Sequence, residues 1–430
     1  MKEYQRCAEE MLRFIEASPS CFHVVENIRR KLIEEGFSEL AETEVWELSF
    51  GKGYFVTRND SSLIAFRLPD KAEPSGFHII ASHSDSPTFK VKEKPELRVE
   101  ERYVRLNTEK YGGMILSTWM DRPLSVAGRV AVKAGNNKIL TKLVNIDKDL
   151  LVIPNVAIHM NRDINKGVEY NPQVDMMPLF AECDEGQEDG ILLREVAATV
   201  GVNPEDILGQ DLFLYVRDKG RILGEGGAFV LSPRLDDLQC VYASVKAFVE
   251  SSPAEYMNVC AVFDNEEVGS GTRQGANSTF LADTLERVGE SMGADRSRFL
   301  GWIAESFLIS ADNAHAVHPN HPEKADPTNR PYLNGGIVIK YHGSQKYTTD
   351  AVSAAKMRQI CAESTVPVQT YANRSDVAGG STLGNISTAH VSVSSVDIGL
   401  PQLAMHSAVE TAGVKDTEYA VRAFSTFYSE

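Results

Sequence analysis

The sequence lacks the features that would place it in a membrane or export it. No apolar run approaches the roughly 18 to 20 uncharged residues that a bilayer-spanning helix requires. The opening segment, MKEYQRCAEEMLRFIEASPS, carries charges where a secretion signal is apolar. We therefore expect a soluble, cytoplasmic protein that does not use a membrane as a partner.

Cysteine pairs are missing and positive charge is in deficit. The six cysteines are scattered without a CxxC pair, which argues against a disulfide framework and against a cysteine-based zinc site. The formal net charge of -16 disfavours nucleic acid as a partner, because the polyanion would be repelled. A small pocket can still hold a local cation, so the total charge does not exclude an acidic substrate.

The pattern of apolar residues predicts an α/β protein with an insertion. A chain of 430 residues with 43% hydrophobic content can form a large core, and its length favours two domains. Helical spacing and then short apolar strands open the chain, and helices alternating with strands close it, which predicts a mostly parallel, mixed sheet covered by helices. Between them, alternating strands with tight turns predict a β-rich domain. The expected boundaries are 1–88 and 228–430 for the discontinuous α/β domain and 89–227 for the insertion.

Histidine and acidic residues follow several of the predicted strands. Ligands of an open parallel sheet gather beyond the carboxyl ends of its strands, so these side chains can converge. Imidazole and carboxylate are the ligands of catalytic zinc, and two histidines with three carboxylates suffice for two ions if one carboxylate bridges. The apolar runs and the residues after them are 77–81 with His83 and Asp85, 259–263 with Glu266 and Glu267, 307–310 with Asp312, and 391–398 with His406, while Asp236 begins the helix after the insertion.

The adjacent pair Glu266 and Glu267 predicts a division of tasks. Neighbouring carboxylates at a strand end point in different directions, so one can bind a metal while the other remains unligated. A peptidase uses such a carboxylate as a general base, which takes a proton from water and delivers it to the leaving amine. Either glutamate alone would also fit a solvated turn. Asp85 can accept the N–H of His83 and fix its tautomer, or it can cap a helix.

Two further patterns are given less weight. Residues 269–275 resemble a dinucleotide-binding loop, but they have one residue too many before the last glycine and follow acidic residues that would repel a pyrophosphate. His315, His318 and His321 crowd one segment, but its prolines favour an irregular loop over a metal cluster.

Five ordered blocks resemble the aspartyl aminopeptidase family of two-zinc metallopeptidases. The resemblance extends over essentially the whole chain and implies a zinc exopeptidase-like fold. It also implies hydrolysis of the N-terminal peptide bond of peptides with a free amino end, with acidic residues (Asp or Glu) preferred. The blocks are ASHSDSPTFKVK (81–92), SPRLDDL (232–238), FDNEEVGS (263–270), SADNAHAVHPN (310–320) and PQLAMHSAVE (401–410).

The resemblance further implies two Zn²⁺ ions per subunit, with one site open to exchange with Co²⁺ or Mn²⁺. Glu266 would be the general base, and Asp85 would orient His83. By the same resemblance, His83, Asp236 and Asp312 hold one ion, and Asp236, Glu267 and His406 hold the other, with Asp236 bridging.

Assembly and substrate preference are also expectations from the resemblance. The insertion would be a dimerisation domain, and the dimers would form a tetrahedral dodecamer with active sites facing an internal chamber. His159 matches a position that reaches the active site of a neighbouring subunit. Lys340 is expected to bind the acidic side chain, since burying that carboxylate unpaired would cost on the order of several kcal/mol. The alternative is a lysine whose ammonium lies in water at a strand end.

The sequence departs from the family pattern at two places and leaves two alternatives open. Asp237 replaces a common asparagine, and residues 379–385 differ from the usual glycine- and threonine-rich segment. A carboxypeptidase or deacylase of the same fold would recognise a substrate carboxylate through arginine or lysine. A non-catalytic assembly scaffold is the other alternative, but a complete set of metal ligands with a base argues against it.

Overall fold

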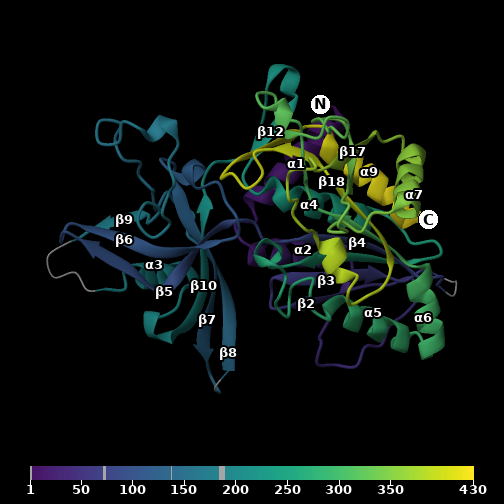
Figure 1. Cartoon of the computed structure of the whole chain (residues 1–430). Helices are drawn as coiled ribbons and strands as arrows, with labels where there is room; N and C mark the ends of the chain where they lie inside the picture. The colour runs from purple at the N-terminus through teal and green to yellow at the C-terminus, as the bar shows by residue number, and fades with distance from the viewer. Residues whose placement is uncertain (1, 71–73, 137, 184–188) are drawn as a thin grey trace. The chain divides into compact units, whose positions relative to one another are not determined.

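The computed structural model describes residues 2–70, 74–136, 138–183 and 189–430. Its chain divides into two compact units (Figure 1). Unit 1 comprises Met1–Asp85, Gly220–Met405 and Glu410–Glu430, and unit 2 comprises Ser86–Lys219 and His406–Val409. The sequence of unit 1 is thus interrupted by that of unit 2.

Unit 1 is built on a nine-stranded mixed sheet. Its central strands β13, β4, β14 and β18 run parallel, whereas β3 and β16 run antiparallel to their inner neighbours. This confirms the predicted central, mostly parallel sheet. In spatial order the strands are β1 (Ser38–Leu40), β2 (Gly53–Arg58), β3 (Ser62–Arg67), β13 (Met257–Phe263), β4 (Phe77–His83), β14 (Phe307–Ala311), β18 (Ser394–Gly399), β16 (Ile337–Tyr341) and β17 (Val368–Ala372).

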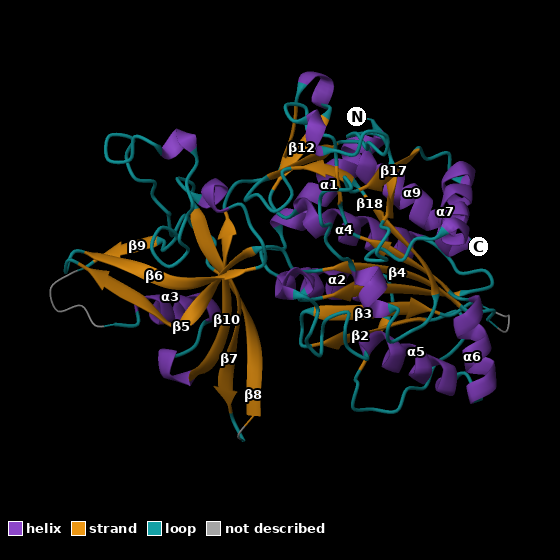
Figure 2. Cartoon of the chain, in the orientation of Figure 1, coloured by secondary structure: helices purple, strands orange, loops and turns teal. Residues whose placement is uncertain are grey.

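Helices cover both faces of this sheet (Figure 2). Every residue of β4 and β13 is buried, and successive side chains face opposite cores, as Ile79 and Ile80 do. Such strands read as continuous apolar runs because both of their faces exclude water. One face carries α1 (Glu3–Glu16), α2 (Cys21–Glu34), α4 (Leu235–Glu250), α7 (Ala351–Glu363) and α9 (Asp416–Ser429), and the other carries α5 (Phe280–Ser291), α6 (Arg296–Glu305) and α8 (Leu383–Ser387).

The parallel strands bring distant parts of the sequence to one edge of the sheet. In the register of β13 and β4, Phe263 lies opposite His83, and in that of β14 and β18, Ala311 lies opposite Ile398. The segments that follow these strands therefore emerge side by side. A second sheet of unit 1 flanks them with β11 (Arg221–Leu223), β12 (Phe229–Ser232), β20 (Glu410–Gly413), β19 (Pro401–Leu403) and β15 (Ala314–His315).

Unit 2 is an antiparallel six-stranded sheet with its own apolar core, which confirms a β-rich insertion. It also contains α3 (Ile191–Val200), which packs Leu192 and Val196 into that core and was not predicted. The dimerisation role of the insertion stays a prediction. The strands are β8 (Lys138–Asn145), β7 (Leu124–Ala134), β10 (Ile207–Val216), β5 (Thr88–Val99), β6 (Tyr103–Tyr111) and β9 (Leu179–Glu182).

None of the helices within the described ranges is both long enough and apolar enough to cross a bilayer. The cytoplasmic location stays a prediction.

Candidate metal centre

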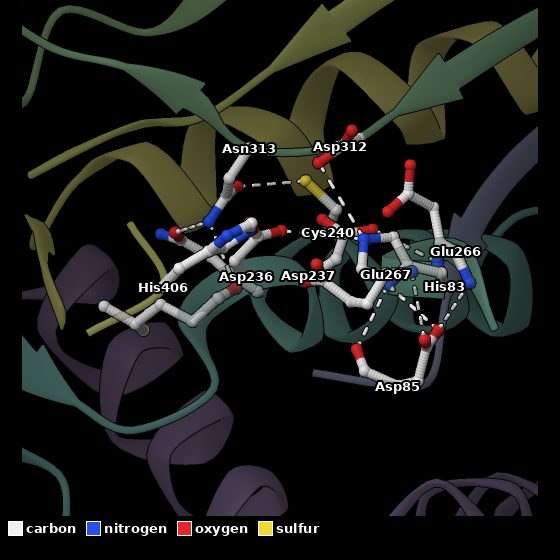
Figure 3. A network of polar contacts seen from close by, with 12 residues as sticks. His83, Asp85, Asp236, Asp237, Cys240, Glu266, Glu267, Asp312, Asn313 and His406 are labelled. Carbon is white, nitrogen blue, oxygen red and sulfur yellow. Dashed lines mark hydrogen bonds and ion pairs between the residues drawn. The ribbon is translucent and has the colours of Figure 1, made fainter. Parts of the chain in front are cut away.

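His83 ends β4 at the carboxyl edge of the sheet and is 1% exposed. Its Nδ1 lies 3.1 Å from the carbonyl oxygen of Asp85, to which it can donate its hydrogen. Its Nε2 lies 3.6 Å from Oδ1 of Asp236 and 3.9 Å from Oδ1 of Asp312 (Figure 3). Two ligand atoms of one tetrahedral zinc ion lie about 3.4 Å apart. The three side chains are therefore spaced more like ligands around a cation than like hydrogen-bond partners.

Asp236 and Asp237 lie in the first turn of α4, where the backbone is not yet helical (φ −82°, ψ 110° and φ −116°, ψ 19°). Oδ2 of Asp237 accepts the backbone N–H of His83 at 3.2 Å. Burial raises the pKa of Asp237 well above its ordinary value; His83 opposes that rise, and the carboxylates of Asp312 and Asp236 add to it. Asp237 thus braces β4 at the candidate ligand His83.

Glu266 and Glu267 lie in a 3₁₀ turn, Glu266–Val268, just after β13. The carboxylate of Asp85 holds this turn, since its Oδ1 accepts the N–H of Glu266 at 3.1 Å and its Oδ2 accepts that of Glu267 at 3.2 Å. Oδ1 of Asp85 also lies 3.4 Å from Nδ1 of His83. The Asp85 carboxylate therefore fixes the backbone of both glutamates, while the backbone carbonyl of Asp85 accepts the Nδ1–H of His83. The orienting role expected of this carboxylate stays a prediction.

The residue before the glutamate turn, Asn265, adopts a left-handed conformation (φ 63°). Its side-chain oxygen accepts hydrogen bonds from Oγ1 of Thr272 at 2.7 Å and from Nε2 of Gln274 at 2.8 Å. The glycine-containing segment 269–275 therefore folds back as a brace for this turn.

Asp312 directly follows β14, and its carboxylate lies between His83 and Lys340. Nζ of Lys340 is 3.6 Å from Oδ2 of Asp312 and 5.5 Å from the centre of the Tyr347 ring. Lys340 is only 3% exposed, so its ammonium is not in water, contrary to the alternative considered from the sequence. Burial works against its charge, but Asp312, Tyr347, Asp397 and Asp236 together outweigh burial and raise the pKa of Lys340 above its ordinary value.

These side chains form a compact set of possible ligands. Single ligand atoms of His83, Asp236, Asp237 and Asp312 all lie within 4.8 Å of one another, as do those of His83, Glu266 and Glu267. Burial, together with the carboxylates of Asp312, Glu267 and Asp85, raises the pKa of Glu266 to about 8 against the opposing effect of His83. The pKa of His83 is also raised, because its carboxylate neighbours outweigh its burial. Such a concentration of negative charge calls for a cation.

A buried polar layer behind the ligands was not predicted from the sequence. Oε2 of Glu410 accepts the N–H of Asp236 at 3.0 Å. Nδ2 of Asn313 donates to the carbonyl of Leu235 at 3.0 Å and to Oε1 of Gln402 at 2.8 Å. Asn313 follows Asp312, and Leu235 precedes Asp236, so this layer fixes the two candidate ligands relative to each other. Adjacency to a candidate ligand was the only sequence signal for Asn313.

Two predicted site residues belong to unit 2. His406 lies in the segment His406–Val409, and its Nδ1 is 2.6 Å from the carbonyl oxygen of Gly113. His159 is exposed in the turn after Ala157, whose carbonyl accepts the N–H of Met160. The roles expected of His406 and His159 stay predictions.

The model of the aminopeptidase I zinc metalloproteases (M18) matches residues 14–428 of this chain. The chain belongs to the M18 family. It is therefore a zinc metallo-aminopeptidase, and the resemblance to this family is confirmed.

Curated relatives agree with the family model. A probable M18 family aminopeptidase 2 of Clostridium novyi (strain NT) is 49% identical over 433 residues and covers 100% of both chains. Aspartyl aminopeptidase 1 of Schizosaccharomyces pombe is 37% identical over 448 residues, which cover 98% of this chain and 94% of that protein.

Solved structures share the fold. A chain in the cryo-EM structure of the Ape4 and Nbr1 complex gives a TM-score of 0.96 at 37% identity, covering 99% of this chain and 86% of the other. A chain of the Saccharomyces cerevisiae mApe1 dodecamer gives a TM-score of 0.86 at 28% identity, covering 99% of this chain and 97% of the other.

The ligand set of this M18 aminopeptidase fits zinc. One imidazole and several carboxylates meet at the edge of the sheet, and these are the ligand types of catalytic zinc sites. The buried cation beside them, Lys340, cannot balance Asp236, Asp312 and the two glutamates by itself. A divalent ion would remove this imbalance and reverse the rise in carboxyl pKa.

We expect Asp85→Asn to lower both turnover and zinc retention. A carboxamide presents an NH₂ group to one of the two N–H donors that the carboxylate now accepts, so the glutamate turn loosens. Loss of a group that orients metal ligands costs about 10- to 100-fold in activity or metal affinity. The measurements are kcat on an aspartyl anilide and bound zinc per chain.

Asp350→Asn is the matched control, because Asp350 also accepts two backbone N–H groups, at 2.9 and 2.8 Å, but at the start of α7. Wild-type turnover and zinc content in Asp85→Asn would show that Asp85 does not hold the site.

Proposed function

We propose that this M18 aminopeptidase prefers acidic residues, Asp or Glu, at the free amino end of its peptide substrates. Two observations support the preference. The 37% identical relative from S. pombe is an aspartyl aminopeptidase. A buried ammonium, that of Lys340, lies next to the candidate metal ligand Asp312.

The surroundings of Lys340 favour a carboxylate as its ligand. Among the described residues its only ion pair is with Asp312, at 3.6 Å, which is longer than a charge-assisted hydrogen bond of about 2.7 to 2.9 Å. As a metal ligand, Asp312 would share its charge with the cation and neutralise the ammonium less. Lys340 would then recognise the carboxylate of an acidic substrate side chain, whose burial requires a cationic partner.

We assign the metal ligands as two overlapping sets with Asp236 as the bridge. His83, Asp236 and Asp312 would hold one Zn²⁺, and Asp236, Glu267 and His406 would hold the other, which we expect to exchange with Co²⁺ or Mn²⁺. The contact of His406 Nδ1 with Gly113 supports Nε2 as its ligand nitrogen. Bound zinc supplies Lewis acidity, which polarises a peptide carbonyl and makes water more acidic.

Glu266 would act as the general base. Its backbone is fixed by Asp85, so its carboxylate has a defined position beside His83 and Glu267. One oxygen of this carboxylate would take a proton from the attacking water as the C–O bond forms. The same oxygen would then deliver that proton to the nitrogen of the leaving amine as the C–N bond breaks.

We also propose that the chain assembles as dimers within a dodecamer, with unit 2 as the dimerisation domain and His159 reaching a neighbouring active site. The S. cerevisiae mApe1 dodecamer, 28% identical, supports this assembly. Around His159, the side chains of Val156, Ile158 and Met160 are exposed, which is typical of an interface. Light scattering on the intact protein measures its mass, and a largest species of two chains would contradict the dodecamer.

The general-base assignment predicts that Glu266→Gln retains its zinc but loses turnover. The amide cannot accept a proton, so kcat falls by about 10²- to 10⁴-fold. Metal analysis and kcat on an aspartyl anilide give both quantities. Asp236→Asn is the contrasting variant and should lower the zinc content itself. Turnover at the wild-type level in Glu266→Gln would exclude Glu266 as the base.

The proposed preference predicts that Lys340→Met lowers activity on acidic substrates alone. A charged hydrogen bond is lost, so kcat/KM for an aspartyl anilide falls about 10- to 100-fold, while that for an alanyl anilide changes little. Lys356→Met, in α7, is the control for removal of a half-buried lysine charge outside the site.

An N-acetylated aspartyl anilide distinguishes the enzyme class in the same assay. An aminopeptidase loses activity on blocking, whereas a deacylase does not. An equal loss on both anilides in Lys340→Met would contradict the role of Lys340 in preference.

A further inference from the structure

Lys340 and Asp397 lie on adjacent antiparallel strands of unit 1. Val338 of β16 pairs with Gly399 of β18, and Ile339 pairs with Ile398. The next step in this register brings Lys340 opposite Asp397. Because Ile339 and Ile398 face one core, Lys340 and Asp397 project from the other face of the sheet. A buried cation and a fully buried carboxylate are thus cross-strand neighbours.

Asp397 nevertheless takes its partners elsewhere. Oδ2 accepts the backbone N–H of Thr348 at 2.6 Å and the hydroxyl of Thr348 at 2.8 Å. Oδ1 accepts the hydroxyl of Thr382 at 2.5 Å. In the described parts of the chain Asp397 forms no ion pair, and Lys340 pairs with Asp312 instead. Neutral donors therefore satisfy a carboxylate that could otherwise neutralise the ammonium.

The same hydrogen bonds join three segments around Lys340. Asp397 belongs to β18, Thr348 follows Tyr347, whose ring lies 5.5 Å from the Lys340 ammonium, and Thr382 precedes α8. The fit is close at Gly384, where a Cβ atom would lie 2.7 Å from Oδ1 of Asp397.

We propose that Asp397, Thr348 and Thr382 form a positioning unit that determines the preference for acidic substrates. The hydrogen bonds from the two threonines keep the Asp397 carboxylate away from the Lys340 ammonium. The hydrogen bond from the backbone N–H of Thr348 keeps the Tyr347 ring close to that ammonium. The ammonium then remains available to the carboxylate of the substrate side chain. This inference rests on the proposed function of Lys340, but it assigns a task to residues that do not touch substrate or metal.

The test removes the hydroxyl donors and leaves Asp397 in place, because replacing a carboxylate that joins three segments endangers the fold itself. Thr382→Val and Thr348→Val each delete one hydroxyl at nearly constant volume. In both variants we expect kcat/KM for an aspartyl anilide to fall about fivefold, chiefly through KM, with an alanyl anilide little changed. Thr382→Ser and Thr348→Ser keep the hydroxyl and should restore the wild-type ratio.

Thr284→Val is the control, since Thr284 is as buried as Thr382 and its hydroxyl donates only to the carbonyl of Phe280 in its own helix. Zinc content is measured in every variant and should not change. An aspartyl-to-alanyl ratio within about twofold of wild type in both valine variants would overturn the proposal, as would an equal loss on both substrates. A wild-type enzyme without acidic preference would instead refute the proposed function, and this inference with it.

Discussion

The candidate metal centre depends on one electrostatic constraint, which is the concentration of carboxylates around a single buried imidazole. Asp236, Asp237, Asp312 and the pair Glu266 and Glu267 meet at the edge of the sheet beside His83. Burial, and after it the repulsion between these carboxylates, raises the pKa of Asp237 and Glu266. Folding can hold such groups together when a cation shares the site, which is why this cluster is consistent with a zinc metalloprotease.

A layer of hydrogen bonds fixes these groups before any metal binds. Asp85 accepts the backbone N–H groups of both glutamates, and Glu410 accepts that of Asp236. Backbone groups held in this way lose little further freedom when a ligand arrives, so the site is preorganised. The cost is a set of buried polar groups that must all be satisfied, and Asn313 shows how closely that requirement is met.

In the proposed function, the residues for catalysis and those for substrate preference are separated along the sheet. The proposed base follows β13 and the candidate ligand His83 ends β4, at the centre of the sheet, whereas Lys340 and Asp397 lie on β16 and β18, toward one edge. Asp312, after β14, lies between them and contacts Lys340. On this proposal, substrate preference could change through residues near β16 without altering the strands next to the proposed base, which is how one family fold can accommodate different substrates.

The sequence by itself determined the architecture and most of the candidate ligands. Apolar runs with His, Asp or Glu after them encode both the buried strands and the chemistry at their ends, so His83, Glu266, Glu267 and Asp312 could be named in advance. Asp236 needed the same reasoning applied to a helix start.

Only the tertiary structure decided which side chains support the candidate ligands and Lys340. Asp397 and Glu410 sit in segments whose sequence signals a strand and nothing more, and their partners are far away along the chain. Hydrogen bonds between distant segments depend on register and side-chain direction, which local periodicity does not encode. For the same reason the sequence could not decide whether the Lys340 ammonium lies in water or in a pocket, whereas its burial in the structure did.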